Sequence, residues 1–367
     1  MKITMRTLTG AAVITLWIAI TAFAWFAPKK ETSLSERRPL QQMPEMNLSD
    51  LQSGSFMGQF ETYTLDQFPL RDGFRSLKAI WSYGVLNNRD NNGLYTVDGY
   101  VAKLDYPLNT VSVQNATEKF SYLYETCLKD ASSAVYMTII PDKGYYLAAE
   151  NGYPAMDYSS LFSQVAEQMP WATMVDITDR LDISHYYKTD SHWRQEKLIP
   201  VAEKLCAAMG AALPNTQVYA ETLADSAFRG VYYGQSALPL ASENLYIMRS
   251  RMLDACQVYN HETKTYTNIY DLQGLGGLDP YDVYLSGAQA HLTIENPNAK
   301  TGRELIVFRD SFGSSLVPLL VQGYDRITVV DIRYIRSDLL AEAIDFNGRD
   351  VLFAYSTSIL NNSASLK

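Results

Sequence analysis

Residues 305–313 read LIVFRDSFG, in which four apolar residues lead into a polar turn and then a glycine. A short apolar run is typical of a strand buried on both faces of a parallel sheet. Such sheets bind ligands beyond the carboxyl ends of their strands, which directs attention to Asp310 and Ser311. Ser311 is therefore a candidate nucleophile, and the free amides of the following helix are candidate oxyanion donors. The alternative is that Asp310 and Ser311 only cap this helix.

Similar apolar runs recur along the chain, and helical segments separate them. The runs lie at residues 134–140, 172–175, 327–330 and 351–354. Helical patterns lie around residues 116–130, 158–169 and 195–209, and others begin near residues 312 and 337. This alternation predicts an α/β fold with a mostly parallel sheet flanked by helices. Residues 213–300 break the alternation and are rich in Tyr, Gly and Asn, which predicts an irregular or hairpin-rich insertion near the site.

A second stretch with side chains suited to catalysis lies upstream, at Thr189-Asp190-Ser191-His192-Trp193. A serine hydroxyl is a poor nucleophile at neutral pH and needs a histidine to take its proton and a carboxylate to orient that histidine. Asp190 and His192 have these two chemistries and are one residue apart. The two stretches together predict a triad of Asp190, His192 and Ser311. The alternative for His192 is a packed or surface histidine without a catalytic role.

Other kinds of site have less support. Residues 234–238 begin like a nucleophile elbow, but Leu238 stands where the second glycine belongs, which disfavours Ser236 against Ser311. The remaining histidines are scattered and form no HExxH arrangement, and there is no CxxC pair, so no metal site is expected. Walker and GxGxxG motifs are absent from the sequence, so no nucleotide cofactor is expected either.

Near the N-terminus, residues 8–27 are apolar and carry no charge. At about 1.5 Å per residue, a helix of this length crosses the hydrocarbon core of a bilayer. We interpret it as a single-pass membrane anchor. The alternative is a cleaved signal peptide, because Ala22-Phe23-Ala24 resembles a signal-peptidase site. Lys and Arg flank both ends of the stretch, so they do not decide its orientation.

Composition divides the chain into three expected parts: a transmembrane anchor at 1–30, a linker with a helical extension at 31–90, and a main domain at 91–367. Apolar periodicity at residues 51–87, interrupted at Pro69, predicts two helices in the extension. The whole chain has 367 residues and is 47% hydrophobic, which suffices for a large core. Its net charge of −9 argues against nucleic-acid binding, which needs clustered Lys and Arg.

Two residue types leave alternatives open. The 26 tyrosines suit a surface for polyhydroxylated ligands, but a tyrosine-rich core would give the same count. Cys127, Cys206 and Cys256 form an odd set without metal-type spacing. They are compatible with one disulfide and one free thiol, or with three unpaired cysteines.

Several motifs resemble those of the DHHW family of membrane-anchored bacterial proteins, which is similar to the SGNH-hydrolase-like proteins of alginate O-acetylation. The resemblance covers most of residues 31–367. Its carriers are Glu36-Arg37-Arg38-Pro39-Leu40, Phe68-Pro69-Leu70-Arg71-Asp72, Pro141-Asp142-Lys143, Thr189-Asp190-Ser191-His192-Trp193, Arg309-Asp310-Ser311-Phe312 and Asp331-Ile332-Arg333-Tyr334. Ser191 stands where the family name has its first histidine.

This resemblance implies roles for individual residues. Asp190, His192 and Ser311 would form the triad, in a chain order opposite to that of ordinary SGNH hydrolases. Their Gly-Asp-Ser block appears here with Arg309 in the glycine position. The backbone of Ser311 and Phe312 would form the oxyanion site. Residues on the substrate side would be Trp193, Arg333 and Tyr334, and the alternative for Arg333 is a structural ion pair.

The resemblance also implies a function. It predicts an extracytoplasmic O-acetyltransferase that acts on a cell-surface polysaccharide, with a membrane-bound O-acyltransferase as the acetyl donor. A carbohydrate O-acetylesterase would use the same triad with water as the acceptor. A third alternative is a catalytically silent glycan-binding scaffold, which the missing glycine before Asp310 favours.

Overall fold

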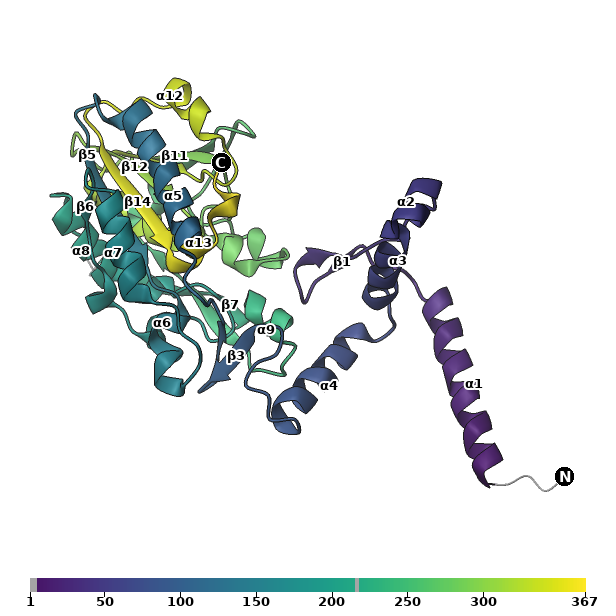
Figure 1. The fold of residues 1–367 in the computed structure, drawn as a ribbon. Coiled ribbons are helices and arrows are strands. Elements are labelled where there is room, and N and C mark those ends of the chain that lie inside the picture. Colours follow the sequence, from purple (N-terminus) through teal and green to yellow (C-terminus); the bar gives the residue numbers. More distant parts are fainter. Residues whose placement is uncertain (1–4, 215–217) are drawn as a thin grey trace. The chain divides into compact units, whose positions relative to one another are not determined.

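The computed structural model describes residues 5–214 and 218–367 and divides into two compact units (Figure 1). The smaller unit comprises the chain up to Asn91 together with Gly234–Pro239, and the larger unit comprises Asn92–Tyr233 and Leu240–Lys367. Residues 1–4 of the expected anchor and residues 215–217 of the expected insertion lie outside the described residues.

Helices dominate the smaller unit. Its elements are α1 (Met5–Phe26), β1 (Thr32–Ser33), β2 (Arg38–Pro39), α2 (Leu48–Ser53), α3 (Ser55–Asp66) and α4 (Arg71–Gly84). Within the described residues, α1 is the one helix long and apolar enough to cross a membrane. The two helices expected on either side of Pro69 are confirmed as α3 and α4.

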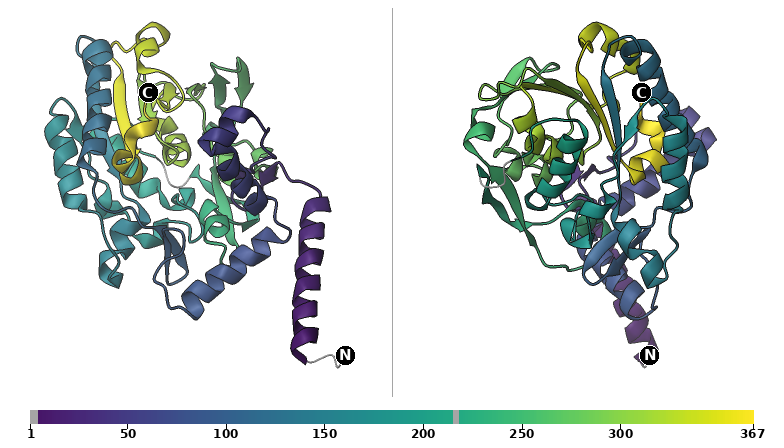
Figure 2. Two further views of the ribbon diagram at one scale, coloured as in Figure 1. Left: turned by 45° about the vertical axis from the view of Figure 1, so that its right-hand side comes forward. Right: turned by 90° about the vertical axis from the view of Figure 1, so that its left-hand side faces the viewer.

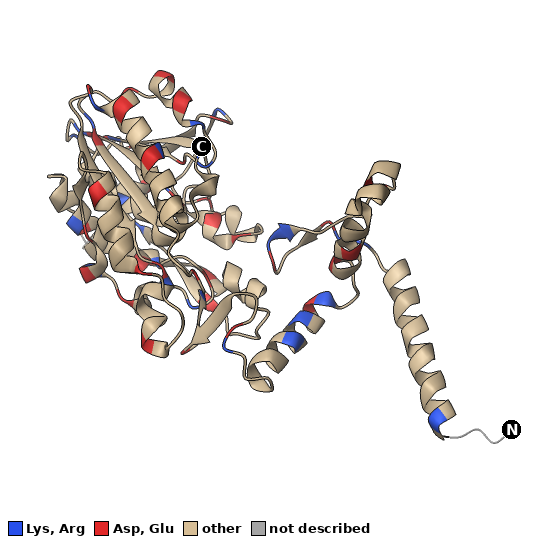
Figure 3. Ribbon diagram, viewed as in Figure 1, with Lys and Arg blue, Asp and Glu red and all other residues tan. Residues whose placement is uncertain are grey.

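The expected linker is held to the smaller unit by ion pairs. Arg38 donates to both carboxylate oxygens of Asp66, at 2.6 and 2.9 Å. This hydrogen bonding holds the pKa of Asp66 below its ordinary value. Glu36 pairs with Arg71 and, at 3.3 Å, with Arg75, both on α4. Figure 3 shows blue basic positions along this helix. Composition alone missed this network because its members are far apart in the sequence.

An eight-stranded sheet forms the centre of the larger unit, in the order β10-β9-β11-β13-β12-β14-β5-β6. The strands are β5 (Ala134–Ile140), β6 (Thr173–Met174), β9 (Gln257–Asn260), β10 (Thr265–Thr267), β11 (His291–Glu295), β12 (Glu304–Arg309), β13 (Arg326–Val330) and β14 (Asp350–Ser356). From β13 to β6 all neighbours are parallel. The expected α/β fold with a mostly parallel sheet is confirmed.

The larger unit also contains helices, several of which flank this sheet, and two hairpins that lie outside it. The helices are α5 (Thr110–Leu123), α6 (Lys143–Leu147), α7 (Tyr158–Gln168), α8 (Ile199–Ala208), α9 (Val231–Ser236), α10 (Arg251–Ala255), α11 (Gly313–Leu316), α12 (Leu340–Ala343) and α13 (Thr357–Asn361). The hairpins pair β3 (Leu94–Val97) with β4 (Tyr100–Lys103), and β7 (Ala220–Phe228) with β8 (Glu243–Arg249). Figure 2 shows α5 and α7 along one face of the sheet.

Both faces of β12 are buried, which explains its uninterrupted apolar run. Leu305 and Val307 belong to the core that includes residues of α8. Ile306 and Phe308 belong to the opposite core, which includes residues of α5 and α7. Successive strand residues point to opposite faces, so a strand covered on both sides needs apolar residues at every position.

Residues 213–300 are more regular than the sequence indicated. The β7–β8 hairpin fits the expectation, but β9, β10 and β11 extend the central sheet in antiparallel register. These strands are only three to five residues long. Such short strands give a weak sequence signal, and the pairing of β11 with β13, which joins all three to the sheet, depends on tertiary contacts.

The three cysteines are free thiols. Cys206 and Cys256 are buried, and Cys127 is partly exposed. Burial raises the pKa of both buried thiols to about 12. These two cysteines therefore stay protonated at neutral pH and act as apolar core residues.

A buried histidine gives a test of the fold. His291 stacks on His261 with ring centroids 3.7 Å apart, and burial lowers the pKa of His291 to about 4. Between this value and the ordinary histidine pKa of 6.5, the unfolded chain binds more protons than the folded chain. We therefore expect the free energy of unfolding to fall as the pH drops through this range. His291→Gln should flatten this dependence in urea titrations, and an unchanged slope would contradict the prediction; His185→Gln is the control.

Candidate active site

Ser311 lies at the carboxyl edge of the sheet, in the turn between β12 and α11. The carboxylate of Asp310 accepts hydrogen bonds from the backbone N–H groups of Phe312 at 3.0 Å and Ser356 at 2.7 Å. Asp310 therefore ties this turn to the end of β14. The Ser311 side chain takes no part in these bonds.

The structure brings the three predicted triad residues together. His192 Nε2 lies 2.7 Å from Ser311 Oγ, and His192 Nδ1 lies 2.6 Å from Asp190 Oδ1. The other oxygen of buried Asp190 accepts a hydrogen bond from the N–H of Val231 at 2.8 Å. With Nδ1–H donating to the carboxylate, Nε2 is available to accept the serine proton.

Aromatic packing fixes the imidazole ring from one side. Tyr281 stacks on His192 with ring centroids 4.1 Å apart and an interplanar angle of 11°. The Tyr281 hydroxyl donates to Ser315 Oγ at 2.8 Å, which anchors the tyrosine on the helix that follows the nucleophile. The ring of His192 is therefore held in the plane that points Nε2 at Ser311.

Trp193 also has a structural position. Its side chain is fully buried, and Nε1 donates to Phe312 O at 3.0 Å and to Ser315 Oγ at 2.9 Å. The expectation that Trp193 contacts substrate is corrected, because a fully buried side chain does not reach a ligand. It instead joins the His192 loop to the Ser311 turn.

Of the two backbone N–H groups expected to bind an oxyanion, that of Phe312 already donates to another acceptor. The Phe312 N–H donates to Asp310, as described above, whereas the Ser311 N–H has no acceptor among residues 5–214 and 218–367. A tetrahedral oxyanion forming on Ser311 needs an N–H that is free to donate. Of the two backbone amides, only that of Ser311 meets this condition.

A cavity of about 160 Å³ adjoins Ser311. Residues at or just beyond the carboxyl ends of β5, β12 and β14 surround it, together with residues of β4, α9, α13 and the His192 loop: Lys103, Asp142, Lys143, Ser191, Tyr232, Ser311, Phe312, Ser356, Ser358 and Ile359. Both oxygens of Asp142 are used, because Tyr158 and Thr357 donate to them at 2.9 and 2.6 Å. Burial raises the pKa of Asp142. This carboxylate therefore links elements around the cavity.

Arg333 and Tyr334 do not line this cavity. Arg333 donates to both oxygens of the buried Asp331, at 2.9 and 2.6 Å. This bidentate ion pair agrees with the alternative role given above for Arg333, a structural ion pair in place of a substrate contact. Tyr334 is half exposed, and its ring lies 5.4 Å from the guanidinium of Arg333.

Arg309, which precedes Asp310 at the end of β12, is fully buried. Its guanidinium donates to Gly287 O at 3.0 Å and lies 3.6 Å from a carboxylate oxygen of Asp331. A Cβ on Gly313 would lie 2.6 Å from Arg309 Cβ. Gly313 therefore leaves room for the Arg309 side chain at the start of α11.

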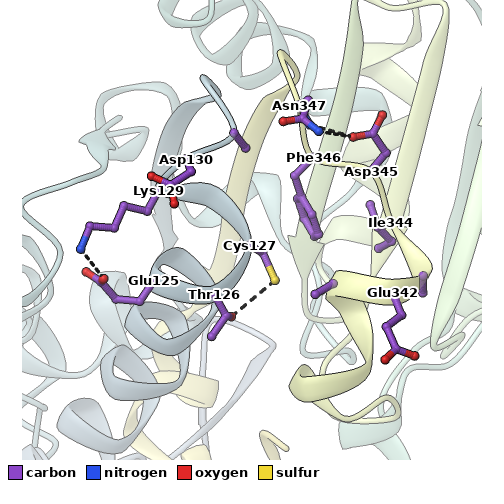
Figure 4. Close-up of a pocket in the computed structure, with 13 residues that line it drawn as sticks. Glu125, Thr126, Cys127, Lys129, Asp130, Glu342, Ile344, Asp345, Phe346 and Asn347 are labelled. Atoms are coloured by element: carbon purple, nitrogen blue, oxygen red, sulfur yellow. Dashed lines mark hydrogen bonds and ion pairs between the residues drawn. The ribbon is translucent and has the colours of Figure 1, made fainter.

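The other candidate positions lie away from this geometry. Ser236 is fully buried, and its hydroxyl accepts a hydrogen bond from the N–H of Leu238, so a substrate does not reach it. Figure 4 shows a further pocket of about 460 Å³ between residues 125–131 and 341–347. These segments precede β5 and β14, so this pocket lies at the amino edge of the parallel strands, opposite Ser311.

Sequence reasoning missed several residues that shape the site. Tyr281, Gly230 and Tyr232 come from the range expected to be an insertion, and no local motif marks them. Gly230 passes so close to Asp190 that an added Cβ would lie 2.3 Å from Asp190 Cβ. Lys143 was visible only as part of the Pro141-Asp142-Lys143 motif.

Comparison with known proteins agrees with this architecture. The DHHW protein family model matches residues 158–330. The matched range contains Asp190, His192 and Ser311, and the match confirms the resemblance predicted from the motifs. No curated protein matches the chain.

Solved structures share the fold. A DHHW family protein from Eubacterium siraeum is 21% identical, with a TM-score of 0.59 over 76% of this chain and 97% of that chain. Bacillus cereus PatB1 with a sulfonyl adduct is 18% identical, with a TM-score of 0.58 over 73% and 97% of the two chains. The O-acetyltransferase domain of Pseudomonas putida AlgJ is 13% identical, with a TM-score of 0.44 over 73% and 92%, a likeness too weak to support a functional statement.

Gly230 provides a test of how tightly Asp190 is held. A methyl group at this position would collide with Asp190 and with Thr189 O, at 2.4 Å. Since misplacing a catalytic group by 1 Å costs about 100-fold, we expect Gly230→Ala to slow fluorophosphonate labelling of Ser311 by about this factor. Gly276→Ala is the control because its Cβ meets nothing within 4 Å. Labelling of Gly230→Ala at the native rate would contradict this account.

Proposed function

We propose that this chain is an extracytoplasmic, serine-dependent O-acetyltransferase that acts on hydroxyls of a cell-surface polysaccharide through an acyl-Ser311 intermediate. The observation that carries the proposal is the pair of short contacts that His192 makes, 2.7 Å to Ser311 Oγ and 2.6 Å to Asp190 Oδ1. This arrangement suits covalent catalysis by a serine.

In the first half-reaction, Ser311 Oγ attacks the carbonyl carbon of an acetyl ester. His192 Nε2 takes the proton from Oγ, and the imidazolium is stabilised by the Asp190 carboxylate. The Ser311 N–H donates to the oxyanion of the tetrahedral intermediate. The bond from the carbonyl carbon to the donor oxygen then breaks, His192 returns its proton to that oxygen, and acetyl-Ser311 remains.

In the second half-reaction, a sugar hydroxyl takes the place of the departed alcohol. His192 Nε2 accepts the hydroxyl proton as the sugar oxygen attacks acetyl-Ser311. When the new intermediate collapses, the bond between the carbonyl carbon and Ser311 Oγ breaks, and the proton on His192 passes to Oγ. The serine is regenerated, and the acetyl group has moved to the sugar.

Several features support the choice of acyl chemistry. The residues that line the cavity of about 160 Å³ include Ser191, Tyr232 and Ser358, whose side-chain type suits a polyhydroxylated acceptor. PatB1, which shares the fold, was solved with a sulfonyl adduct, and sulfonyl groups modify activated nucleophiles. The acetyl group, the polysaccharide and a membrane-bound O-acyltransferase as donor follow from the resemblance of the motifs to the alginate O-acetylation proteins.

The proposed location rests on α1. Its 22 residues, Met5–Phe26, form a helix that is apolar enough to span a bilayer, although a signal sequence has the same character. We propose that α1 stays attached as a single-pass anchor in the cell membrane and that the larger unit lies outside the cytoplasm. In this arrangement the active site works on surface polysaccharide.

Acyl-enzyme formation is the direct test. We expect intact-mass spectrometry of the full chain, incubated with p-nitrophenyl acetate, to show one acetyl adduct. Ser311→Ala should abolish the adduct, and His192→Ala should slow its formation at least about 1,000-fold because the general base is lost. Ser226→Ala, which changes an exposed serine that does not line the cavity, is the control. Absence of any adduct or turnover in the native chain would contradict the proposal and favour the scaffold alternative.

The acceptor is tested separately from the nucleophile. Pre-formed acetyl-Ser311 should lose its acetyl group faster when polysaccharide is added, and the acetyl group should appear on the glycan. An esterase would instead release acetate at the same rate with or without glycan. Mass analysis of the glycan, alongside a measurement of free acetate, distinguishes the two outcomes, and release to water alone would reject the transferase assignment.

A further inference from the structure

Lys143 is a buried cation beside the proposed triad. Its side chain is 3% exposed, and Nζ donates to the backbone carbonyls of Tyr187 and Lys188, at 3.1 and 3.2 Å. These carbonyls belong to the segment that leads directly into Asp190. The centroid of the Tyr232 ring lies 4.9 Å from Nζ. No carboxylate lies within ion-pair distance of Nζ among the residues that the structure describes.

Glu243, the first residue of β8, accepts hydrogen bonds from the N–H groups of the same segment. One oxygen accepts from the N–H of Lys188 at 2.9 Å. The other accepts from the N–H and the hydroxyl of Thr189, at 2.8 and 2.9 Å. Lys143 therefore donates to the carbonyl groups of the segment, and the Glu243 carboxylate accepts from its N–H groups.

We infer that Lys143 and Glu243 are positioning residues that clamp residues 187–189 and thereby hold Asp190 and His192 in line with Ser311. The inference rests on the proposed function, because it assigns these side chains a purpose in the Ser311 chemistry. Hydrogen bonds to charged groups are stronger than neutral ones, so the clamp restrains the backbone more firmly than a turn of ordinary amides.

The clamp also accounts for burying an ammonium group without a paired carboxylate. Burial lowers the pKa of Lys143 to about 7, against the attraction of the more distant Asp190, Glu243 and Asp142. Both the ammonium and the neutral amine have at least two N–H groups, which are enough for the carbonyls of residues 187 and 188. The clamp therefore persists in either protonation state.

The test compares four variants of the full chain in detergent micelles. Lys143→Met removes the donors, Glu243→Gln removes the negative charge with little change in shape, a third variant combines both changes, and Lys143→Arg keeps a cationic donor. We expect each of the first two to slow acetylation of Ser311 by p-nitrophenyl acetate about 10- to 100-fold, mainly in kcat, with partial rescue in Lys143→Arg. The double variant should lose less than the product of the two single losses, because both changes loosen one segment.

A spectroscopic readout separates positioning from general stability. The proton shared by His192 Nδ1 and Asp190 should give a low-field proton resonance, and we expect it to broaden or disappear in Lys143→Met and Glu243→Gln below their unfolding temperatures. Lys204→Met and Glu295→Gln, which disturb ion pairs with Asp179 and Arg326, should leave both the resonance and the rate unchanged.

The outcomes distinguish the clamp from the proposed function. A native rate and an unchanged resonance in Lys143→Met and Glu243→Gln would overturn the clamp, as would losses that multiply in the double variant. If Lys143→Met does not fold, the near-isosteric Glu243→Gln carries the test. If the native chain forms no acyl adduct, the proposed function fails, and the resonance still decides whether these residues hold the Asp190 and His192 pair.

Discussion

The docking of the residue 189–193 loop onto the turn after β12 is the interaction on which the site depends. Trp193 Nε1 donates to Phe312 O and Ser315 Oγ, and Tyr281 bonds the same serine while stacking on His192. These buried contacts join segments 119 residues apart. Unpaired buried polar groups are costly, so these hydrogen bonds favour one position of the loop. In that position Nε2 of His192 lies within hydrogen-bond distance of Ser311.

Three carboxylates also help to hold the segments around the site in place. Asp310 joins the nucleophile turn to β14, Asp190 joins the histidine loop to α9, and Asp142 joins α6 to α13. Each is satisfied by backbone or hydroxyl donors. The parallel strands bring these groups together, since β5, β12 and β14 all end at one edge. The sheet therefore supplies a rigid frame, and the buried hydrogen bonds set the positions within it.

Sequence reasoning succeeded where chemistry and local pattern coincide. The apolar runs at β5, β12, β13 and β14 identified the parallel strands. Residue chemistry and motif resemblance named Asp190, His192 and Ser311, and the structure places the His192 side chain within hydrogen-bond distance of the other two. It failed for side chains whose role depends on burial. Trp193 looked like a substrate contact but is buried, and the Phe312 N–H, expected to face an oxyanion, is taken by Asp310.

The sequence alone determined the class of fold, because strands covered on both faces leave uninterrupted apolar runs and crossover helices leave periodic ones. It also determined which chemical groups were available. Only the tertiary structure decided that Ser311 and His192 are hydrogen-bonded, that β9, β10 and β11 extend the sheet, and that Lys143 and Glu243 converge on one segment. Such contacts join residues far apart in the chain, and their geometry follows from the packing of the whole sheet, which no local pattern encodes.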